Sequence, residues 1–141
     1  MKKIIYGLMV LSVMAQADFT RSSAGVVTDN KTKLEWQDDY SDNDGKVKSG
    51  VFKDAITYCE DLKLDNGDWR LPNINELKSL IIDKLAPTID SKFKNTSTTN
   101  YYLSSTTILQ QYYASSYAVY FKDGKVSSAR KTYSKYIRCV R

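Results

Sequence analysis

The sequence contains no histidine, and its 141 residues include only two cysteines and two prolines. The absence of histidine excludes Ser-His-Asp triads, histidine general bases and histidine metal ligands. With so little proline and no linker rich in proline or glycine, one continuous domain is the simplest organisation. Beyond the first residues, no apolar run approaches the roughly 20 residues that a membrane-spanning helix needs. We therefore expect one domain without a transmembrane anchor.

The beginning of the chain is typical of a signal peptide. Its start is basic, residues 4–14 are mostly apolar, and residues 15–17 (Ala-Gln-Ala) supply a cleavage site of small residues. An amphipathic or buried N-terminal helix is the alternative interpretation. The order of the three elements favours a signal peptide over residues 1–17. Residues 18–141 would then form a single exported domain, in the periplasm, at the cell surface or outside the cell.

The two cysteines, Cys59 and Cys139, are far apart in the sequence. Exported proteins mature in an oxidising compartment, where an even number of cysteines favours a disulfide. Two buried free thiols are the alternative.

Two helices are predicted between residues 52 and 86. Apolar side chains at helical spacing predict the first over residues 52–62, with Cys59 on the buried stripe. The second is predicted to begin at Asn73, because Asn73 can cap it and Glu76 can complete a capping box. Pro87 must lie beyond its end.

The remaining elements are predicted to be strands. Residues 24–37 have the pattern of a hairpin, and Asp123-Gly124 is expected to form a two-residue turn that pairs Phe121 with Val126. Residues 88–100 are polar and lack periodicity, which predicts a long loop. The other predicted strands cover 101–107, 114–121, 125–131 and 136–140. The fold class is therefore α+β, with two helices packed on antiparallel sheets and a long loop region.

Several segments of the chain resemble the C-terminal domain of the Legionella collagen-like protein (Lcl), a bacterial family long labelled a domain of unknown function. The resemblance covers nearly all of residues 18–141. A departure is Leu103, where family members usually carry Trp. The matching segments are Gly25–Thr32, Leu34–Asp38, Ala55 with Tyr58–Cys59, Asp68–Leu77, Ser104–Thr107 and Arg138–Arg141.

The family is similar to a branch of the C-type lectin-like superfamily, which implies a C-type lectin-like fold. In that superfamily a cysteine of the first helix is joined to a cysteine of the last strand, which implies a Cys59–Cys139 pair. For some relatives the resemblance implies adhesion or binding of sulfated glycans, and it implies no agreed function for the family as a whole.

Basic residues are concentrated near the C-terminus, and Asp123 is the sole acid among residues 122–141. Arginine and lysine can pair with sulfate, phosphate or carboxylate groups, and tyrosine rings can stack on sugars. A solvated β surface is the alternative. Nucleic acid would use the same electrostatics, but export makes it a less expected partner. The candidate ligand-binding residues are Lys125, Arg130, Lys131, Lys135 and Arg138, with Tyr117 and Tyr133.

An acidic loop offers weak candidates for calcium ligands, Asp42 and Asp44. If they stood at positions 3 and 5 of a helix–loop–helix site, Val51 would fall where a bidentate glutamate is needed. No metal or cofactor is therefore expected.

These observations favour an exported, non-catalytic, lectin-like or adhesin-type module that binds an anionic polysaccharide or a host-surface glycan. One alternative is a protein-interaction subunit of a cell-envelope assembly. Another is an unrecognised hydrolase that uses paired carboxylates. Catalysis is not expected, because the chain has no histidine, no catalytic motif, and two cysteines that are expected to be bonded.

Overall fold

The computed structural model describes residues 18–82, 86–109 and 112–141. The predicted signal peptide lies outside these residues. Within them, no helix is long and apolar enough to cross a membrane. In chain order the elements are β1 (Phe19–Arg21), β2 (Val26–Asp29), β3 (Glu35–Gln37), η1 (Ser41–Asn43), β4 (Ser49–Gly50), α1 (Phe52–Asp61), η2 (Leu64–Asn66), α2 (Ile74–Ser79), β5 (Tyr102–Ile108), β6 (Ser115–Tyr120), β7 (Lys125–Arg130) and β8 (Lys135–Tyr136).

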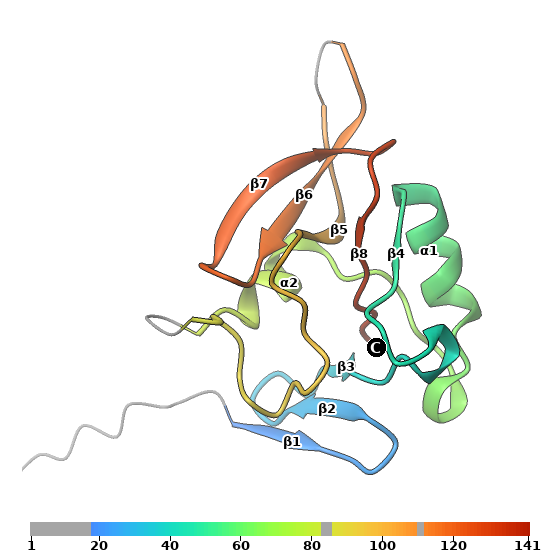
Figure 1. The fold of residues 1–141 in the computed structure, drawn as a ribbon, viewed down its shortest axis with the longest axis vertical. Helices are drawn as coiled ribbons and strands as arrows, with labels where there is room; N and C mark the ends of the chain where they lie inside the picture. Colours follow the sequence, from blue (N-terminus) through green and yellow to red (C-terminus); the bar gives the residue numbers. More distant parts are fainter. Residues whose placement is uncertain (1–17, 83–85, 110–111) are drawn as a thin grey trace, which may run out of the picture.

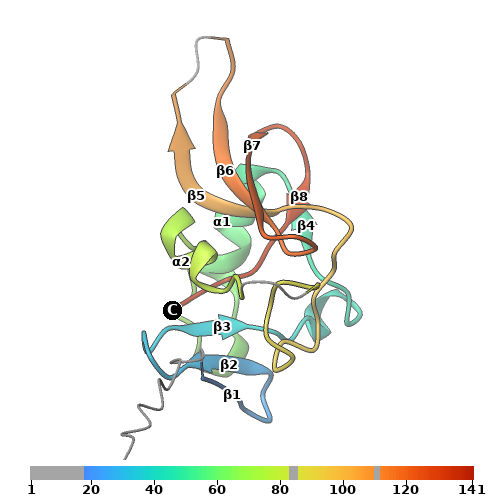
Figure 2. The same ribbon diagram turned by 90° about the vertical axis from the view of Figure 1, so that its left-hand side faces the viewer.

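The strands form two sheets, which confirms the predicted α+β class. β1, β2 and β3 form a three-stranded antiparallel sheet, and the five-stranded sheet has the order β4-β8-β5-β6-β7. In the larger sheet β5 and β8 are parallel neighbours, whereas its other pairs are antiparallel. Figure 1 shows the small sheet below the large one, with α1 along one side. In Figure 2 the β5–β6 hairpin stands out from the body of the domain.

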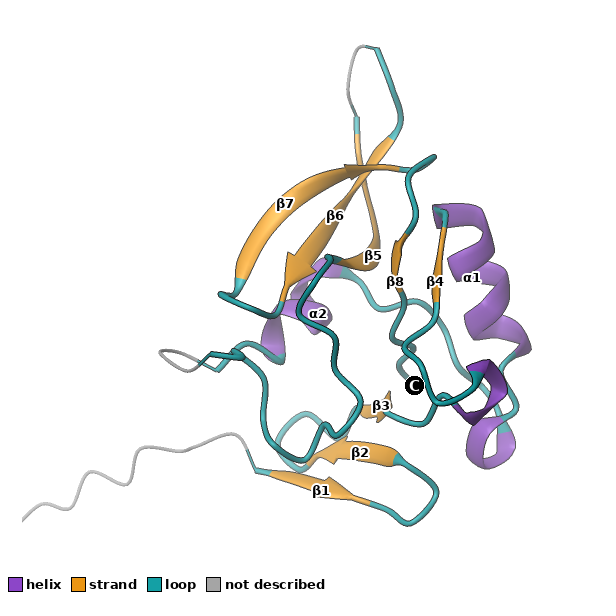
Figure 3. Ribbon diagram, viewed as in Figure 1, coloured by secondary structure: helices purple, strands orange, loops and turns teal. Residues whose placement is uncertain are grey.

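Both predicted helices are present (Figure 3). α1 buries Ala55 and Cys59, as its apolar stripe predicted. α2 has the predicted capping box, in which Asn73 accepts a hydrogen bond from the Glu76 amide and Glu76 accepts one from the Asn73 amide. The Glu76 carboxylate also accepts hydrogen bonds from both Nη atoms of Arg70, at 2.8 and 2.7 Å.

The apolar core has two parts. The first lies between the two sheets, where Trp36 of β3, Leu77 of α2 and Tyr102 of β5 belong to one buried cluster. The second lies between α1 and the large sheet, and Leu103 is fully buried there. Both faces of the large sheet are therefore partly covered.

The pairing predicted for the strands on either side of the β6–β7 turn is wrong. Val126 pairs with Val119 rather than with Phe121, and Tyr120 pairs with Lys125, so four residues form the connection. The reason is that Phe121 leaves the ladder: its ring is buried, and its carbonyl accepts the Thr88 amide at 2.8 Å.

The predicted C-terminal strand is also corrected. β8 has only two residues, and the chain then leaves the large sheet to run between β3 and Arg70. There Val140 makes bridges to both Trp36 and Arg70. Sequence reasoning also missed β1, a short strand that precedes the predicted hairpin.

The predicted disulfide is present. Cys59 and Cys139 are joined with a Cα–Cα distance of 5.5 Å, and they close a loop of 80 residues. The bond ties α1 to the C-terminal segment inside the second core cluster.

Replacing both cysteines with serine should lower the free energy of unfolding by about 4 kcal/mol, because the unfolded chain regains the entropy that the closed loop removes. Urea denaturation of the wild type and the variant measures the difference, and reduction of the wild type should reproduce it. Equal denaturation midpoints for the oxidised wild type and the variant would contradict this role.

Candidate functional site

Arg138, a predicted ligand-binding residue, is not on the surface. Its side chain is completely buried, and its guanidinium lies 4.6 Å from the Phe93 ring centroid. Its Nη2 atom donates to the Asn95 carbonyl at 2.7 Å and to Thr96 Oγ1 at 3.0 Å, and it lies 3.4 Å from Asp38 Oδ1. Arg138 therefore holds the interior together and is unavailable to a glycan.

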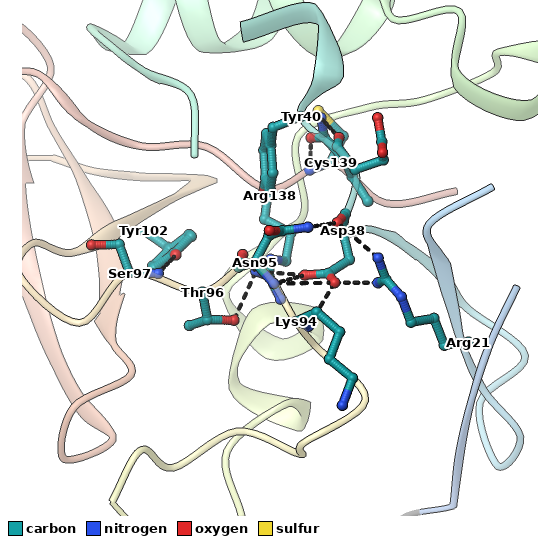
Figure 4. A network of polar contacts seen from close by, with 12 residues as sticks. Arg21, Asp38, Tyr40, Lys94, Asn95, Thr96, Ser97, Tyr102, Arg138 and Cys139 are labelled. Carbon is teal, nitrogen blue, oxygen red and sulfur yellow. Dashed lines mark hydrogen bonds and ion pairs between the residues drawn. The ribbon is translucent and has the colours of Figure 1, made fainter. Parts of the chain in front are cut away.

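Asp38 is the centre of this buried network (Figure 4). Its carboxylate accepts hydrogen bonds from Arg21 and from the backbone amides of Lys94 and Asn95, the last two at 2.7 and 3.1 Å. Burial raises the pKa of Asp38, while Arg138 and the other donors act in the opposite direction. The network thus joins β1, the segment after β3, the long loop and the C-terminal segment.

The Asp38→Asn variant should lose about 3 kcal/mol or more of folding free energy, because an amide nitrogen would then face donors and Arg138 would lose its counter-charge. Thermal or urea denaturation provides the measurement. The neighbouring Asp39→Asn change is the matched control, with an expected loss of about 1 kcal/mol, since the hydrogen bonds that the Asp39 carboxylate accepts from described residues are the local ones from Ser41. Equal stability of the Asp38→Asn variant and the wild type would contradict this assignment.

The remaining predicted residues occupy two opposite faces of the large sheet. Lys125 and Arg130 stand at the two ends of β7, an odd number of positions apart, so their side chains point to opposite faces. The basic run in the sequence therefore does not fold into one patch.

A row of side chains runs across the large sheet from β8 to β7. Lys135 lies at one end of this row and Lys125 at the other. Lys135 Nζ lies 5.9 Å from the ring centroid of Tyr101, and that ring stacks on Tyr120 with centroids 4.9 Å apart. Tyr120 in turn pairs with Lys125 across β6 and β7. We call these four residues, Lys135, Tyr101, Tyr120 and Lys125, the lysine–tyrosine row.

Arg130 lies on the other face among tyrosines. Its guanidinium carbon is 4.1 Å from the Tyr113 ring centroid and 5.6 Å from that of Tyr133. Tyr117 is a diagonal neighbour of Arg130, because Ser115 pairs with Arg130 and Tyr117 lies two positions along β6. This arginine–tyrosine cluster (Tyr113, Tyr117, Arg130 and Tyr133) is exposed at the base of the β5–β6 hairpin.

Lys131 is separate from the arginine–tyrosine cluster. Its Nζ atom lies 4.0 Å from the Phe52 ring centroid and donates to Thr107 Oγ1 at 2.8 Å. It thus bridges α1 and β5.

The candidate cations on the surface have no acidic partner in the part of the chain that the structure describes. Among the described residues, the ion pairs involve Arg21, Arg70, Arg138 and Arg141, and none involves Lys125, Arg130, Lys131 or Lys135. The positive charge on both faces of the large sheet is therefore available to an anion.

The weak calcium candidates are engaged in local structure. Asp42 accepts a hydrogen bond from the Tyr58 hydroxyl at 3.3 Å, and Asp44 ends η1 in a left-handed conformation. In the described part of the chain, no three His, Cys, Asp or Glu side chains gather as metal ligands would.

Of the aromatic residues on these surfaces, sequence reasoning missed Tyr101 and did not select Tyr113 or Tyr120 as candidate site residues. A signal for Tyr120 was present, because it stands three residues before the predicted turn and Lys125 directly follows that turn. Because the predicted β6–β7 register was incorrect, it did not pair Tyr120 with Lys125.

The fold and its surfaces define an α+β domain that is closed by a disulfide and exposes basic and aromatic side chains. The profile of the Lcl C-terminal domain family matches residues 25–141, so the chain belongs to that family. The family resemblance found in the sequence is thereby confirmed, and the relation to the C-type lectin-like superfamily stays a prediction. No curated protein matches the sequence.

Proposed function

We propose that this chain is an exported, non-catalytic binding domain that holds anionic glycans on the lysine–tyrosine row. The observation that carries the proposal is the order of the row, with a stacked pair of tyrosines between two lysines that have no acidic partner among the described residues. Stacked rings offer an apolar surface to the C–H faces of sugars. The terminal ammonium groups would pair with sulfate, phosphate or carboxylate groups.

The dimensions of the row suit an extended polymer. Three inter-strand spacings separate β8 from β7, which places the backbones of Lys135 and Lys125 about 14 Å apart. That span accommodates a few sugar rings with an anionic group near each end. The arginine–tyrosine cluster, on the opposite face, offers a second contact to a long polymer.

Two features support export and a non-catalytic role. The N-terminal sequence has the pattern of a signal peptide, and the Cys59–Cys139 disulfide is of a kind that persists in oxidising compartments. The same bond occupies both cysteines, and the chain has no histidine to serve as a general base.

Dextran sulfate and uncharged dextran form a matched pair of probes. The oxidised protein should bind dextran sulfate and heparin but not dextran, and the affinity should fall as salt is added. The Lys125→Gln/Lys135→Gln variant should bind at least about tenfold more weakly, because it loses two charge-assisted contacts. Isothermal titration calorimetry measures both effects.

The Lys31→Gln/Lys92→Gln variant removes the same charge from exposed positions outside the row and should bind as the wild type does. Equal weakening by the two double variants would show that net charge alone attracts the polymer. Equal affinity for duplex DNA would show that the surface does not select glycans. Either result, or no binding to any sulfated polymer, would overturn the proposal.

The β5–β6 hairpin favours the second candidate, a protein-interaction subunit of an envelope assembly. Leu109 is 97% exposed and Tyr112 is 84% exposed near its tip, and exposed apolar groups of this kind are typical of protein contacts. A defined envelope protein that binds the wild type but not a Leu109→Ser/Tyr112→Ser variant, in the absence of glycan binding, would favour this alternative.

A further inference from the structure

A groove lies beside α1, and its lining includes no residue of the lysine–tyrosine row or of the arginine–tyrosine cluster. It has a volume of about 550 Å³, which is within the range of small-molecule sites. α1 forms one wall, and residues from η1 and the segment before β4 form the other. Its lining residues are Asp42, Lys48, Asp54, Thr57, Tyr58, Asp61, Leu62 and Lys63.

The aromatic ring in the groove is held in place. The Tyr58 hydroxyl accepts a hydrogen bond from Gln37 Nε2 at 2.7 Å and donates one to Asp42 Oδ1 at 3.3 Å. Burial raises the pKa of Tyr58, so its hydroxyl stays neutral. The Tyr58 ring, held in this way, and Leu62 give the groove an apolar surface.

The rest of the lining offers both kinds of hydrogen-bonding partner. Asp54 and Asp61 are seven residues apart on α1, which places them on the same side of the helix. Lys48 and Lys63 supply donors. In the part of the chain that the structure describes, none of these four side chains is in an ion pair.

The mixed charge of the lining selects against charged ligands. Three aspartates would repel an anion such as a sulfated sugar. A cation would meet two lysines, and Lys48 Nζ already stands 5.6 Å from the Tyr58 ring centroid, where an ammonium ligand would stack. An uncharged ring with many hydroxyl groups fits instead, because it has an apolar face for Tyr58 and hydroxyls for carboxylates and ammonium groups.

We infer that this groove binds a neutral saccharide, either free or as one residue of a glycan. The tyrosine ring and Leu62 contact the apolar face of the sugar, and Asp54, Asp61 and Lys48 bind its hydroxyl groups. This site takes a different ligand class from the lysine–tyrosine row and does not depend on the function proposed for that row.

Nuclear magnetic resonance of the ¹⁵N-labelled, oxidised protein tests the inference. Glucose, galactose, mannose and N-acetylglucosamine are titrated separately, and the amide signals of residues 54–63 are followed. At least one sugar should shift these signals in a saturable manner, while signals from the lysine–tyrosine row stay in place.

The Asp54→Asn/Asp61→Asn variant should bind that sugar about tenfold more weakly or worse, because hydrogen bonds to charged acceptors are among the strong ones. Glu60→Gln is the matched control: it lies on the same helix, is exposed and does not line the groove, so it should bind as the wild type does. Thr57→Arg, which extends a long side chain across the groove, should abolish binding. The dispersion of each amide spectrum reports whether the variant is folded.

The inference is overturned if none of the four sugars shifts residues 54–63, if the shifts lie elsewhere, or if the folded aspartate variant binds as tightly as the wild type. Dextran sulfate binding should be unaffected by the Asp54→Asn/Asp61→Asn change. A failure of either site is therefore distinguishable from a failure of the other.

Discussion

The buried carboxylate of Asp38 brings together segments that are far apart in the sequence. It accepts hydrogen bonds from Arg21 of β1, from the amides of Lys94 and Asn95 in the long loop, and from Arg138 of the C-terminal segment. Burying an isolated charge would cost several kcal/mol, so the Asp38 carboxylate and the Arg138 guanidinium are tolerated there only together, each with hydrogen bonds to neighbouring groups. This constraint fixes the long loop against both sheets, although the loop has no regular secondary structure.

The last residues of the chain depend on the same arrangement. Arg138 points toward the loop, while the adjacent Cys139 points toward α1 and forms the disulfide. Val140 bridges β3 and Arg70, and Arg141 pairs with Glu35 and Asp65. Because Arg138 and Arg141 are engaged in contacts within the domain, the candidate residues left for an anionic ligand are those of β7, the segment that follows it, and the start of β8. The groove beside α1 is a separate surface with balanced charge.

Local patterns predicted the helices, the capping box, the β2–β3 hairpin and the cysteine on the buried stripe of α1, since each of these depends on neighbouring residues. The β6–β7 register was not predictable in this way, because Thr88 captures the Phe121 carbonyl from outside the hairpin. The burial of Arg138 was also not predictable from local patterns, because its partner Asp38 is 100 positions away. In the candidate site, the sequence identified the lysines of the row but not the stacking of Tyr101 on Tyr120 between them, because only the pairing of the strands brings the two rings together.

Native-state hydrogen exchange of the Lys94 and Asn95 amides tests the central role of Asp38 most directly. Both amides donate to the Asp38 carboxylate, at 2.7 and 3.1 Å. If this network holds the domain together, the two amides exchange only in the opening that also exposes the amides of β6, with the same free energy. Exchange of both amides at the rate of exposed loop residues, while β6 stays protected, would contradict that role.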